Sequence, residues 1–567
     1  MTNSEIEQKL KLTAKLMELH GENTFKSRSY QTAAETIYSI DLDISKLTEE
    51  EILNIEGVGK GMAKNISELL TKGTFENLQQ LIDETPDEVI EMMGISGFGP
   101  KKVGLLWREG GIVSLDDLLL QCQQGKIASI KGFGEKSQET LFKAVQFKIS
   151  NRGKEKFAIV EPVMNELTAL LERSSLVQKV SETGEMRRKL EIITELEILV
   201  ATEDFDDCSD AINEISELTE DFDLSGPFAW VGHHKSIGVP VKIKFTSEES
   251  FYSELISSTG SIHHLNLTLK DSVPLKDRLV EGYHSEEAFY TSLGLPFIPP
   301  ELREGRNELV LAEKKELPEL IEMSDLKGIL HNHSTYSDGK HSLRQMAEYC
   351  KNLGYEYLGI SDHSQTAVYA NGLQDFRVKQ QQEEIKLLNE ELAPFRVFSG
   401  IESDILNDGS LDYDEDVLSS FDFIVASIHS GLNMDINKAT NRLLTAIKNP
   451  FTTILGHMTG RLLLQRQGYP VDHKTIIDAC AENGVVIEIN ASPYRLDIDW
   501  RWVDYAIEKG VMLSINPDAH KMEGYNDMYY GLQVARKGGL TKEMNLNSKK
   551  LDDISSYFKE RKKMALK

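Results

Sequence analysis

Short apolar runs alternate with amphipathic helical patterns along the last part of the chain. From about residue 318 onward, seven such runs each end in polar residues: LKGILHNHS, YEYLGISDHS, FRVFSGIESDI, FDFIVASIHS, FTTILGHMTG, VVIEINASP and VMLSINPDAH. Patterns such as HSLRQMAEYCKNLG and HKTIIDACAENG lie between them. Strands that alternate with helices form parallel sheets with helical crossovers. The seven units therefore predict a closed (β/α)7 barrel, whose chemistry lies where the strands end.

The residues at these strand ends are of the types that bind metal ions. The first run ends in His331 and His333, which lie two positions apart and therefore on one side of an extended chain. The full predicted ligand set is His331, His333, Asp338, His363, Glu402, His429, His457, Asp518 and His520. Imidazole and carboxylate together suit zinc, manganese or iron rather than calcium. Because nine ligands are too many for one ion, we predict three divalent ions with open positions for water and substrate, an arrangement that supports phosphoester hydrolysis.

A different repeat occurs in residues 1 to about 150, where short amphipathic helices are joined by glycine turns. The form I-x-G-h-G recurs at 55–59, 95–99 and 130–134, each time before a lysine and a helical pattern. Paired glycines allow a tight turn and a close approach, and the unpaired N–H groups of the helix that follows suit a phosphate. The repeat resembles the helix-hairpin-helix motif, which holds DNA by its backbone. The predicted DNA contacts are Gly57, Gly59, Lys60, Gly97, Gly99, Lys101, Lys102, Gly132, Gly134 and Lys136, with Lys26 and Arg28 as candidate contacts to a 5′-phosphate.

Charge and composition restrict how such a chain can act. The 567 residues exceed the size of a single hydrophobic core and predict several domains. A net charge of -28 argues against broad adhesion to nucleic acid, so DNA contacts must be local. The four cysteines form no C-x-x-C pair, and no apolar run approaches the roughly 20 residues of a membrane span. Since the start also lacks the pattern of a signal peptide, we expect a cytoplasmic protein without a membrane partner.

The strand-end motifs H-x-H, S-D-G, D-H-S, G-I-E, I-H-S, G-H and D-A-H resemble the PHP (polymerase and histidinol phosphatase) family over about 320–567. The resemblance implies one ion at His331, His333, Glu402 and Asp518, a second at Glu402, His429 and His457, and a third at Asp338, His363 and His520. Arg461 and Arg495 are candidate phosphate clamps, because a guanidinium fork fits phosphate; a structural salt bridge is the alternative for each.

With the hairpins in front, the whole chain resembles a bacterial-type family X DNA polymerase with a C-terminal PHP domain. The predicted fold is multidomain: all-α helix-hairpin-helix domains, an α+β polymerase-like palm and thumb, and the barrel. The predicted boundaries are 1–80 for a lyase-like domain with the first hairpin, 81–150 for a fingers-like domain with two more, 151–317 for palm and thumb, and 318–567 for the barrel.

The palm departs from that family's pattern. The family's G-S-x-R-R reads Gly184-Glu185-Met186-Arg187-Arg188, its D-x-D reads Glu195-Leu196-Glu197, and Lys242 stands where a third aspartate belongs. These changes put a carboxylate where a triphosphate lies and an ammonium where magnesium lies, and lengthen two ligands for an ion that requires near-ideal geometry. We therefore predict no magnesium at the palm and loss of polymerase activity, with Lys242 paired to Glu195 or Glu197.

The predicted function is metal-dependent hydrolysis of DNA at 3′ ends by the barrel, as a 3′→5′ exonuclease or end-cleaning enzyme of DNA repair. The family implies incision at abasic sites as an extension. The predicted partner of this monomeric protein is gapped, nicked or 3′-damaged DNA. Three alternatives stay open: an active gap-filling polymerase with proofreading, a small-molecule phosphatase, and a non-catalytic DNA-binding scaffold.

Overall fold

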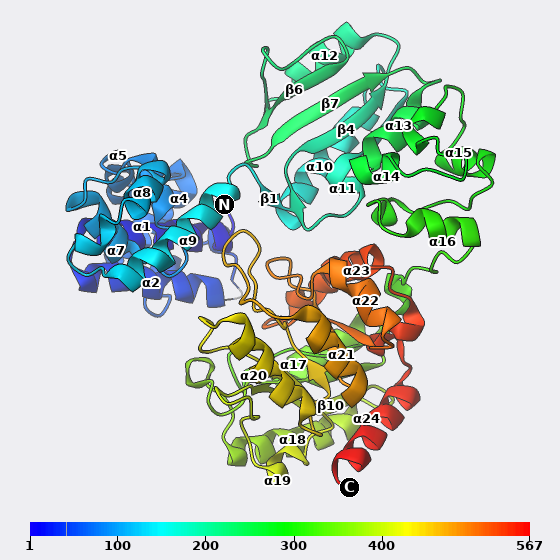
Figure 1. Ribbon diagram of the computed structural model, residues 1–567. Helices are drawn as coiled ribbons and strands as arrows, with labels where there is room; N and C mark the ends of the chain where they lie inside the picture. The colour runs from blue at the N-terminus through cyan, green and yellow to red at the C-terminus, as the bar shows by residue number, and fades with distance from the viewer. Residues whose placement is uncertain (41) are drawn as a thin grey trace. The chain divides into compact units, whose positions relative to one another are not determined.

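The structure, a computed structural model, describes residues 1–40 and 42–567. It divides into two compact units, 1–152 and 153–567, each with its own hydrophobic core (Figure 1). The boundary at 152/153 coincides with the end of the predicted hairpin region. The finer division into four domains stays a prediction. None of the described helices is long and apolar enough to cross a membrane.

The first unit is entirely helical in the described residues. Its helices are α1 (Asn3–His20), α2 (Thr24–Ser39), α3 (Glu49–Leu53), α4 (Lys60–Lys72), α5 (Glu76–Asp83), α6 (Asp87–Met92), α7 (Pro100–Arg108), α8 (Leu115–Gln123) and α9 (Glu135–Ser150). Their starts follow local rules, as in the capping box that Thr2 and Glu5 form at α1. The hydrophobic residue of a hairpin turn anchors the turn in this core, since Val58 and Phe98 are buried.

The second unit begins with a five-stranded mixed sheet in the order β2-β4-β7-β6-β5. The strands of this region are β1 (Glu155–Lys156), β2 (Lys179–Glu182), β3 (Ile192–Ile193), β4 (Leu196–Ala201), β5 (Leu218–Glu220), β6 (Ala229–His234) and β7 (Pro240–Thr246). The helices are α10 (Phe157–Glu172), α11 (Gly184–Arg187), α12 (Phe205–Asn213), α13 (Phe251–Thr259), α14 (Ile262–Leu265), α15 (Glu286–Ser292) and α16 (Glu308–Lys314). The central strands β4 and β7 run parallel, which places residues from distant parts of the chain side by side.

The rest of the second unit is the predicted barrel. Its seven parallel strands follow chain order: β8 (Gly328–Ile329), β9 (Tyr357–Ile360), β10 (Arg396–Asp404), β11 (Phe423–Ser427), β12 (Ile454–Leu455), β13 (Val486–Asn490) and β14 (Leu513–Asn516). A parallel bridge between Asn332 and Ala519 joins the extensions of the first and last strands and nearly closes the barrel. Each of the seven apolar runs contains one strand, so the prediction of a (β/α)7 barrel is confirmed.

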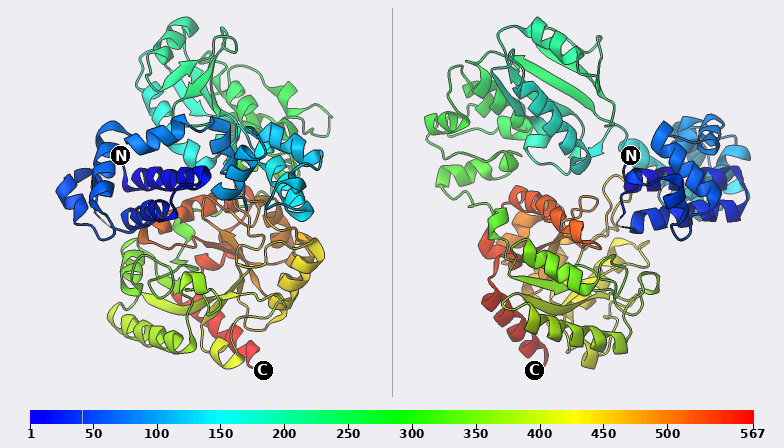
Figure 2. Two further views of the ribbon diagram at one scale, coloured as in Figure 1. Left: turned by 90° about the vertical axis from the view of Figure 1, so that its left-hand side faces the viewer. Right: turned by 180° about the vertical axis from the view of Figure 1, so that it is seen from behind.

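Helices surround the barrel strands, as the further views in Figure 2 show. They are α17 (Leu343–Asn352), α18 (Asp375–Glu391), α19 (Glu415–Leu418), α20 (Ile436–Lys448), α21 (His473–Asn483), α22 (Val503–Glu508), α23 (Met528–Lys537) and α24 (Leu551–Ala565). Phe558 of α24 packs against Phe398 and Phe423 near the strand starts, with ring centroids 5.2 Å apart in each pair. These aromatic side chains pack near the amino ends of the strands, whereas the predicted ligands lie at or near the carboxyl ends.

Candidate metal centre

The carboxyl end of the barrel brings all nine predicted ligands together. His331, His333 and Asp338 follow β8, and each of the later ligands lies in or just after its strand: His363 after β9, Glu402 in β10, His429 after β11, His457 after β12, and Asp518 and His520 after β14. They form four overlapping groups of side chains whose ligand atoms lie within 4.8 Å of one another. Parallel strands end at one edge of the sheet, so His333 and His520, which are 187 positions apart in the chain, become neighbours.

Glu402 lies at the centre of the cluster and is fully buried. Its Oε1 lies 3.2 Å from His331 Nε2, 3.1 Å from His429 Nε2 and 3.0 Å from His457 Nε2. Its other oxygen, Oε2, lies 2.9 Å from His363 Nδ1. One carboxylate therefore contacts imidazoles from four different strand ends, which is the position of a bridging ligand.

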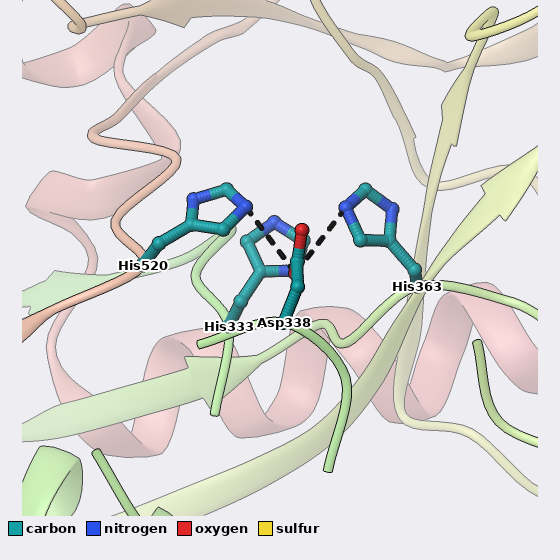
Figure 3. Close-up of side chains that lie close together, drawn as sticks. All are labelled: His333, Asp338, His363 and His520. Carbon is teal, nitrogen blue, oxygen red and sulfur yellow. Dashed lines mark ion pairs between the residues drawn. The ribbon is translucent and has the colours of Figure 1, made fainter. Parts of the chain in front are cut away.

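A second group gathers around Asp338, whose Oδ1 lies 3.6 Å from His363 Nε2 and 3.4 Å from His520 Nε2 (Figure 3). His333 belongs to the same group and stacks on His520, with ring centroids 4.2 Å apart. The family resemblance places Asp338, His363 and His520 on one ion, and the structure brings these three together with His333 added.

Elsewhere the grouping differs in detail from the resemblance. His331, Glu402 and His457 form one group, and His363, Glu402 and His429 form another, whereas the resemblance pairs His429 with His457. Both of these histidines contact the same oxygen of Glu402. The difference therefore concerns which neighbours share an ion, while the set of nine residues is unchanged.

The chemistry of this donor set fits metal ions. Buried polar atoms normally have partners, yet His331 Nε2, His333 Nδ1 and Glu402 Oε2 have no hydrogen bond. Burial opposes the ionised form of Glu402, but His429 and its neighbours outweigh this and hold its pKa well below the usual range. Burial, with its histidine neighbours, lowers the pKa of His333 to about 3. Burial opposes the charged form of His429, but Glu402 and Asp404 outweigh this and raise its pKa to about 10. A divalent cation would take the place of such a proton, because imidazole and carboxylate ligands bind it in their deprotonated forms.

The backbone is strained at two of the nine positions. His331 and Asp518 have φ angles of 56° and 52°, in the left-handed region that residues with a Cβ rarely adopt. Asp518 N donates to His331 O over 3.0 Å, so the two strained residues hold each other. Strain of this kind costs about 1–3 kcal/mol per residue and concentrates at functional sites.

Two carboxylates behind the histidines were missed by the sequence prediction. Glu488 Oε2 lies 2.5 Å from His331 Nδ1, and Glu488 Oε1 accepts from His457 N and from Asn490 Nδ2. Asp404 Oδ1 likewise lies 2.5 Å from His429 Nδ1. A signal was present, because Glu488 precedes Asn490 by two residues and Asp404 follows Glu402 by two, which puts each pair on one side of its strand.

The two candidate phosphate clamps are held differently. Arg461 donates to Asp499 Oδ2 over 2.8 Å and to the carbonyls of Arg495 and Leu496, so its guanidinium braces a loop. Arg495, on that loop, lies 3.9 Å from Asp518 Oδ2 and is 22% exposed. The structure therefore places Arg495 beside the cluster with its donors accessible.

The three predicted hairpins share one local geometry. Their first glycines, Gly57, Gly97 and Gly132, have φ angles of 79°, 80° and 93°. Their second glycines, Gly59, Gly99 and Gly134, are the N-caps of α4, α7 and α9, and no side chain caps these helices. A Cβ added to any of the second glycines would meet nothing within 4 Å. Three helix starts are thus open to an anion, as a DNA backbone contact requires.

The predicted lysines follow these glycines at the helix starts. Lys60 is the first residue of α4, Lys101 and Lys102 lie in the first turn of α7, and Lys136 lies in that of α9. Lys102 also lies over the Phe98 ring, 4.8 Å from its centroid. Lys26 and Arg28 are exposed on α2, where Lys26 is 3.9 Å from Glu22 and 3.4 Å from Asn77 Oδ1.

Comparisons with known proteins agree with both sites. The model of a helix-hairpin-helix domain matches residues 1–75, that of a SAM-like helix-hairpin-helix tandem matches 89–146, and that of the PHP domain matches 330–492. A protein of Bacillus subtilis (strain 168) named DNA polymerase/3'-5' exonuclease PolX is 34% identical over 99% of this chain and 100% of its own length. The chain belongs to the PolX family. The predicted resemblance is confirmed.

Other relatives match less than half of the chain. A probable phosphatase of Thermoanaerobacter sp. (strain X514) is 26% identical over 42% of this chain and 97% of its own length. A probable phosphatase of Acetivibrio thermocellus is 26% identical over 41% of this chain and 95% of its own length. The PHP domain and the buried cluster together indicate a metal-dependent hydrolase.

The region predicted to be the palm contains ion pairs at the positions predicted for the polymerase carboxylates. Glu197 on β4 is in register with Lys242 on β7. Lys242 Nζ lies 3.8 Å from Glu195 Oε2, and Lys244 Nζ lies 2.9 Å from Glu197 Oε1. The sequence prediction paired Lys242 with a glutamate but missed Lys244. Within residues 1–40 and 42–567, every metal-type group of His, Cys, Asp or Glu side chains lies in the barrel.

Glu185 and Arg187, the other two residues predicted for the polymerase site, also bind groups within the protein. Glu185 Oε2 accepts from the N and Oγ1 of Thr194, over 2.5 and 2.9 Å. Arg187 forms a bidentate pair with the buried carboxylate of Glu286, which Arg303 contacts as well. Breaking a buried pair of this kind costs about 3–5 kcal/mol. Arg187, which the resemblance places in the G-S-x-R-R motif, is therefore held by a carboxylate of the protein itself.

Proposed function

We propose that this chain is a DNA-repair exonuclease that hydrolyses phosphodiesters at 3′ ends in its PHP barrel, and that its palm no longer polymerises DNA. The observation that carries the proposal is the cluster around Glu402, in a chain that also has three open hairpins. A relative named DNA polymerase/3'-5' exonuclease supports the same activity. The hairpins would hold the backbone of gapped, nicked or 3′-damaged DNA without reading its sequence.

Three divalent ions would be held by the nine side chains, with Glu402 shared between ions. Manganese and zinc suit these ligands, and so does iron. Such ions supply a water of lowered pKa and stabilise charge on the attacking and leaving oxygens. The protein's own part is to fix the imidazoles through Glu488 and Asp404, and to place the Arg495 guanidinium beside Asp518, where it could bind a phosphate oxygen at the cluster.

The activity is tested on labelled gapped DNA with manganese. The wild-type protein is expected to release nucleotides from the 3′ end, and His333→Ala to lower this rate at least about a hundredfold, since a metal ligand is lost. His473→Ala serves as the control, because His473 stacks on Trp502 outside the cluster. Equal rates for wild type and His333→Ala would contradict the proposal.

The phosphatase alternative receives support from the relatives that are named probable phosphatases. It is distinguished by comparing the same wild-type protein on DNA and on p-nitrophenyl phosphate. A metabolite phosphatase would turn over the monoester faster than the 3′ end, and the hairpins would then have no part in catalysis.

Glu488→Gln is expected to weaken metal binding about 10- to 100-fold while the fold is kept. The amide cannot hold His331 Nδ1 as the carboxylate does, so the ring loses its fixed orientation and basicity. The measurement is competition with a chromophoric chelator, which gives a dissociation constant without any turnover. The matched control is Glu482→Gln, at an exposed position on α21. An unchanged constant for Glu488→Gln would show that the carboxylate has no positioning role.

A further inference from the structure

We propose that Tyr369 and Val368 form a stacking platform for the unpaired base of a 3′-terminal nucleotide, so that the nuclease takes a frayed or single-stranded end. The proposal deepens the proposed function and rests on it. Tyr369 belongs to the short turn Val368–Ala370 that follows β9. Its ring centroid lies 6.2 Å from that of His363, one of the nine cluster residues.

Both side chains are exposed, and Tyr369 lies beside the cluster residue His363. Tyr369 is 71% exposed and Val368 is 81% exposed. The residues on either side, Ala367 and Ala370, are buried. The turn therefore buries its two alanines and presents the larger side chains of Val368 and Tyr369 to solvent. Contact of these two side chains with a ligand would remove their apolar surface from water, which would stabilise the complex.

The turn is held rigidly from several directions. Gly372 N donates to Ala367 O over 3.0 Å, and a Cβ at Gly372 would lie 1.9 Å from Ser364 O. Asn371 adopts a φ of 55°, and Arg377 Nη1 donates to its carbonyl over 2.8 Å. A turn whose backbone is already ordered loses little conformational entropy when a ligand binds to it, as a stacking platform requires.

The location selects a nucleobase as the occupant. A phosphodiester at the metal cluster has a sugar and a base within a few ångströms of the cleaved bond. The Tyr369 ring lies next to the ring of His363, which belongs to the cluster. Stacking accepts every base, because each has a π face. A base paired in a duplex already stacks on its neighbours, so the exposed ring favours an end that has left the helix.

The direct test uses an oligonucleotide whose 3′-terminal base is 2-aminopurine, bound to the full chain in the presence of a chelator. Stacking on Tyr369 is expected to quench the fluorescence for the wild type and for Tyr369→Phe, and not for Tyr369→Ala. Phe222→Ala is the control, since Phe222 is 79% exposed and lies between β5 and β6 of the palm sheet. Quenching that Tyr369→Ala leaves intact, or a wild type without quenching, overturns the proposal.

The kinetic test compares two oligonucleotides that differ only at the 3′ terminus, one with a base and one with a tetrahydrofuran residue that lacks it. With manganese, Tyr369→Ala is expected to raise KM roughly tenfold on the substrate with a terminal base and to leave KM unchanged on the substrate without one. Tyr369→Phe is expected to keep the wild-type KM on both substrates. An equal loss on both substrates means that the residue is structural and overturns the platform. If the wild type cleaves neither substrate, the proposed function fails, and the fluorescence result alone decides the platform.

Discussion

Glu402→Gln is expected to lower 3′-nucleotide release at least about a thousandfold and to reduce the bound metal. Four imidazoles contact this carboxylate through its two oxygens, at 2.9 to 3.2 Å. An amide keeps the shape but supplies one weak oxygen ligand and no charge, so the ions that share Glu402 are lost together. Substitution of a residue that contacts one ion leaves the others in place, which is why this change has the largest expected effect.

The experiment pairs elemental analysis of purified protein with the gapped-DNA assay. The control is Glu383→Gln, on the exposed part of α18. Metal content is expected to fall in Glu402→Gln and to stay at the wild-type level in the control. A Glu402→Gln protein that keeps its full metal content and its activity would show that the carboxylate does not bridge ions, and that the reaction occurs elsewhere.

No templated primer extension is expected from the palm, with either magnesium or manganese. Lys242 and Lys244 lie beside Glu195 and Glu197, and a divalent ion within about 4 Å of an ammonium group is repelled by several kcal/mol at moderate effective dielectric. Burial and the neighbouring Glu197 raise the pKa of Glu195, which further weakens it as a ligand. Arg187 is held by Glu286 and is not free to bind a triphosphate.

The measurement is extension of a labelled primer on gapped DNA with dNTPs. The His333→Ala background is used, so that degradation does not hide synthesis. The decisive comparison adds Glu197→Ala to that background. A template-dependent ladder that disappears on adding Glu197→Ala would overturn the prediction and establish the polymerase with proofreading as the correct alternative.

The sequence by itself determined the features that depend on neighbours along the chain. Seven apolar runs with helical patterns between them predicted the barrel, because strand and helix periods are local. Residue types at the run ends predicted the nine-residue cluster for the same reason, since parallel strands must end at one edge. The glycines of the hairpins predicted tight turns, because glycine adopts backbone conformations that few other residues do, such as the φ of 79° at Gly57.

The tertiary structure alone decided which side chains meet. Glu488 is 157 residues from His331, and the contact depends on strand order and barrel closure, which no local pattern encodes. The register of β4 and β7 likewise decided that Lys244, and not Lys242 alone, pairs with the palm glutamates. Arg461 became a loop brace because Asp499 and two carbonyls use its donors. Such contacts are set by the packing of distant elements, so the sequence supplies the groups while the fold fixes their partners.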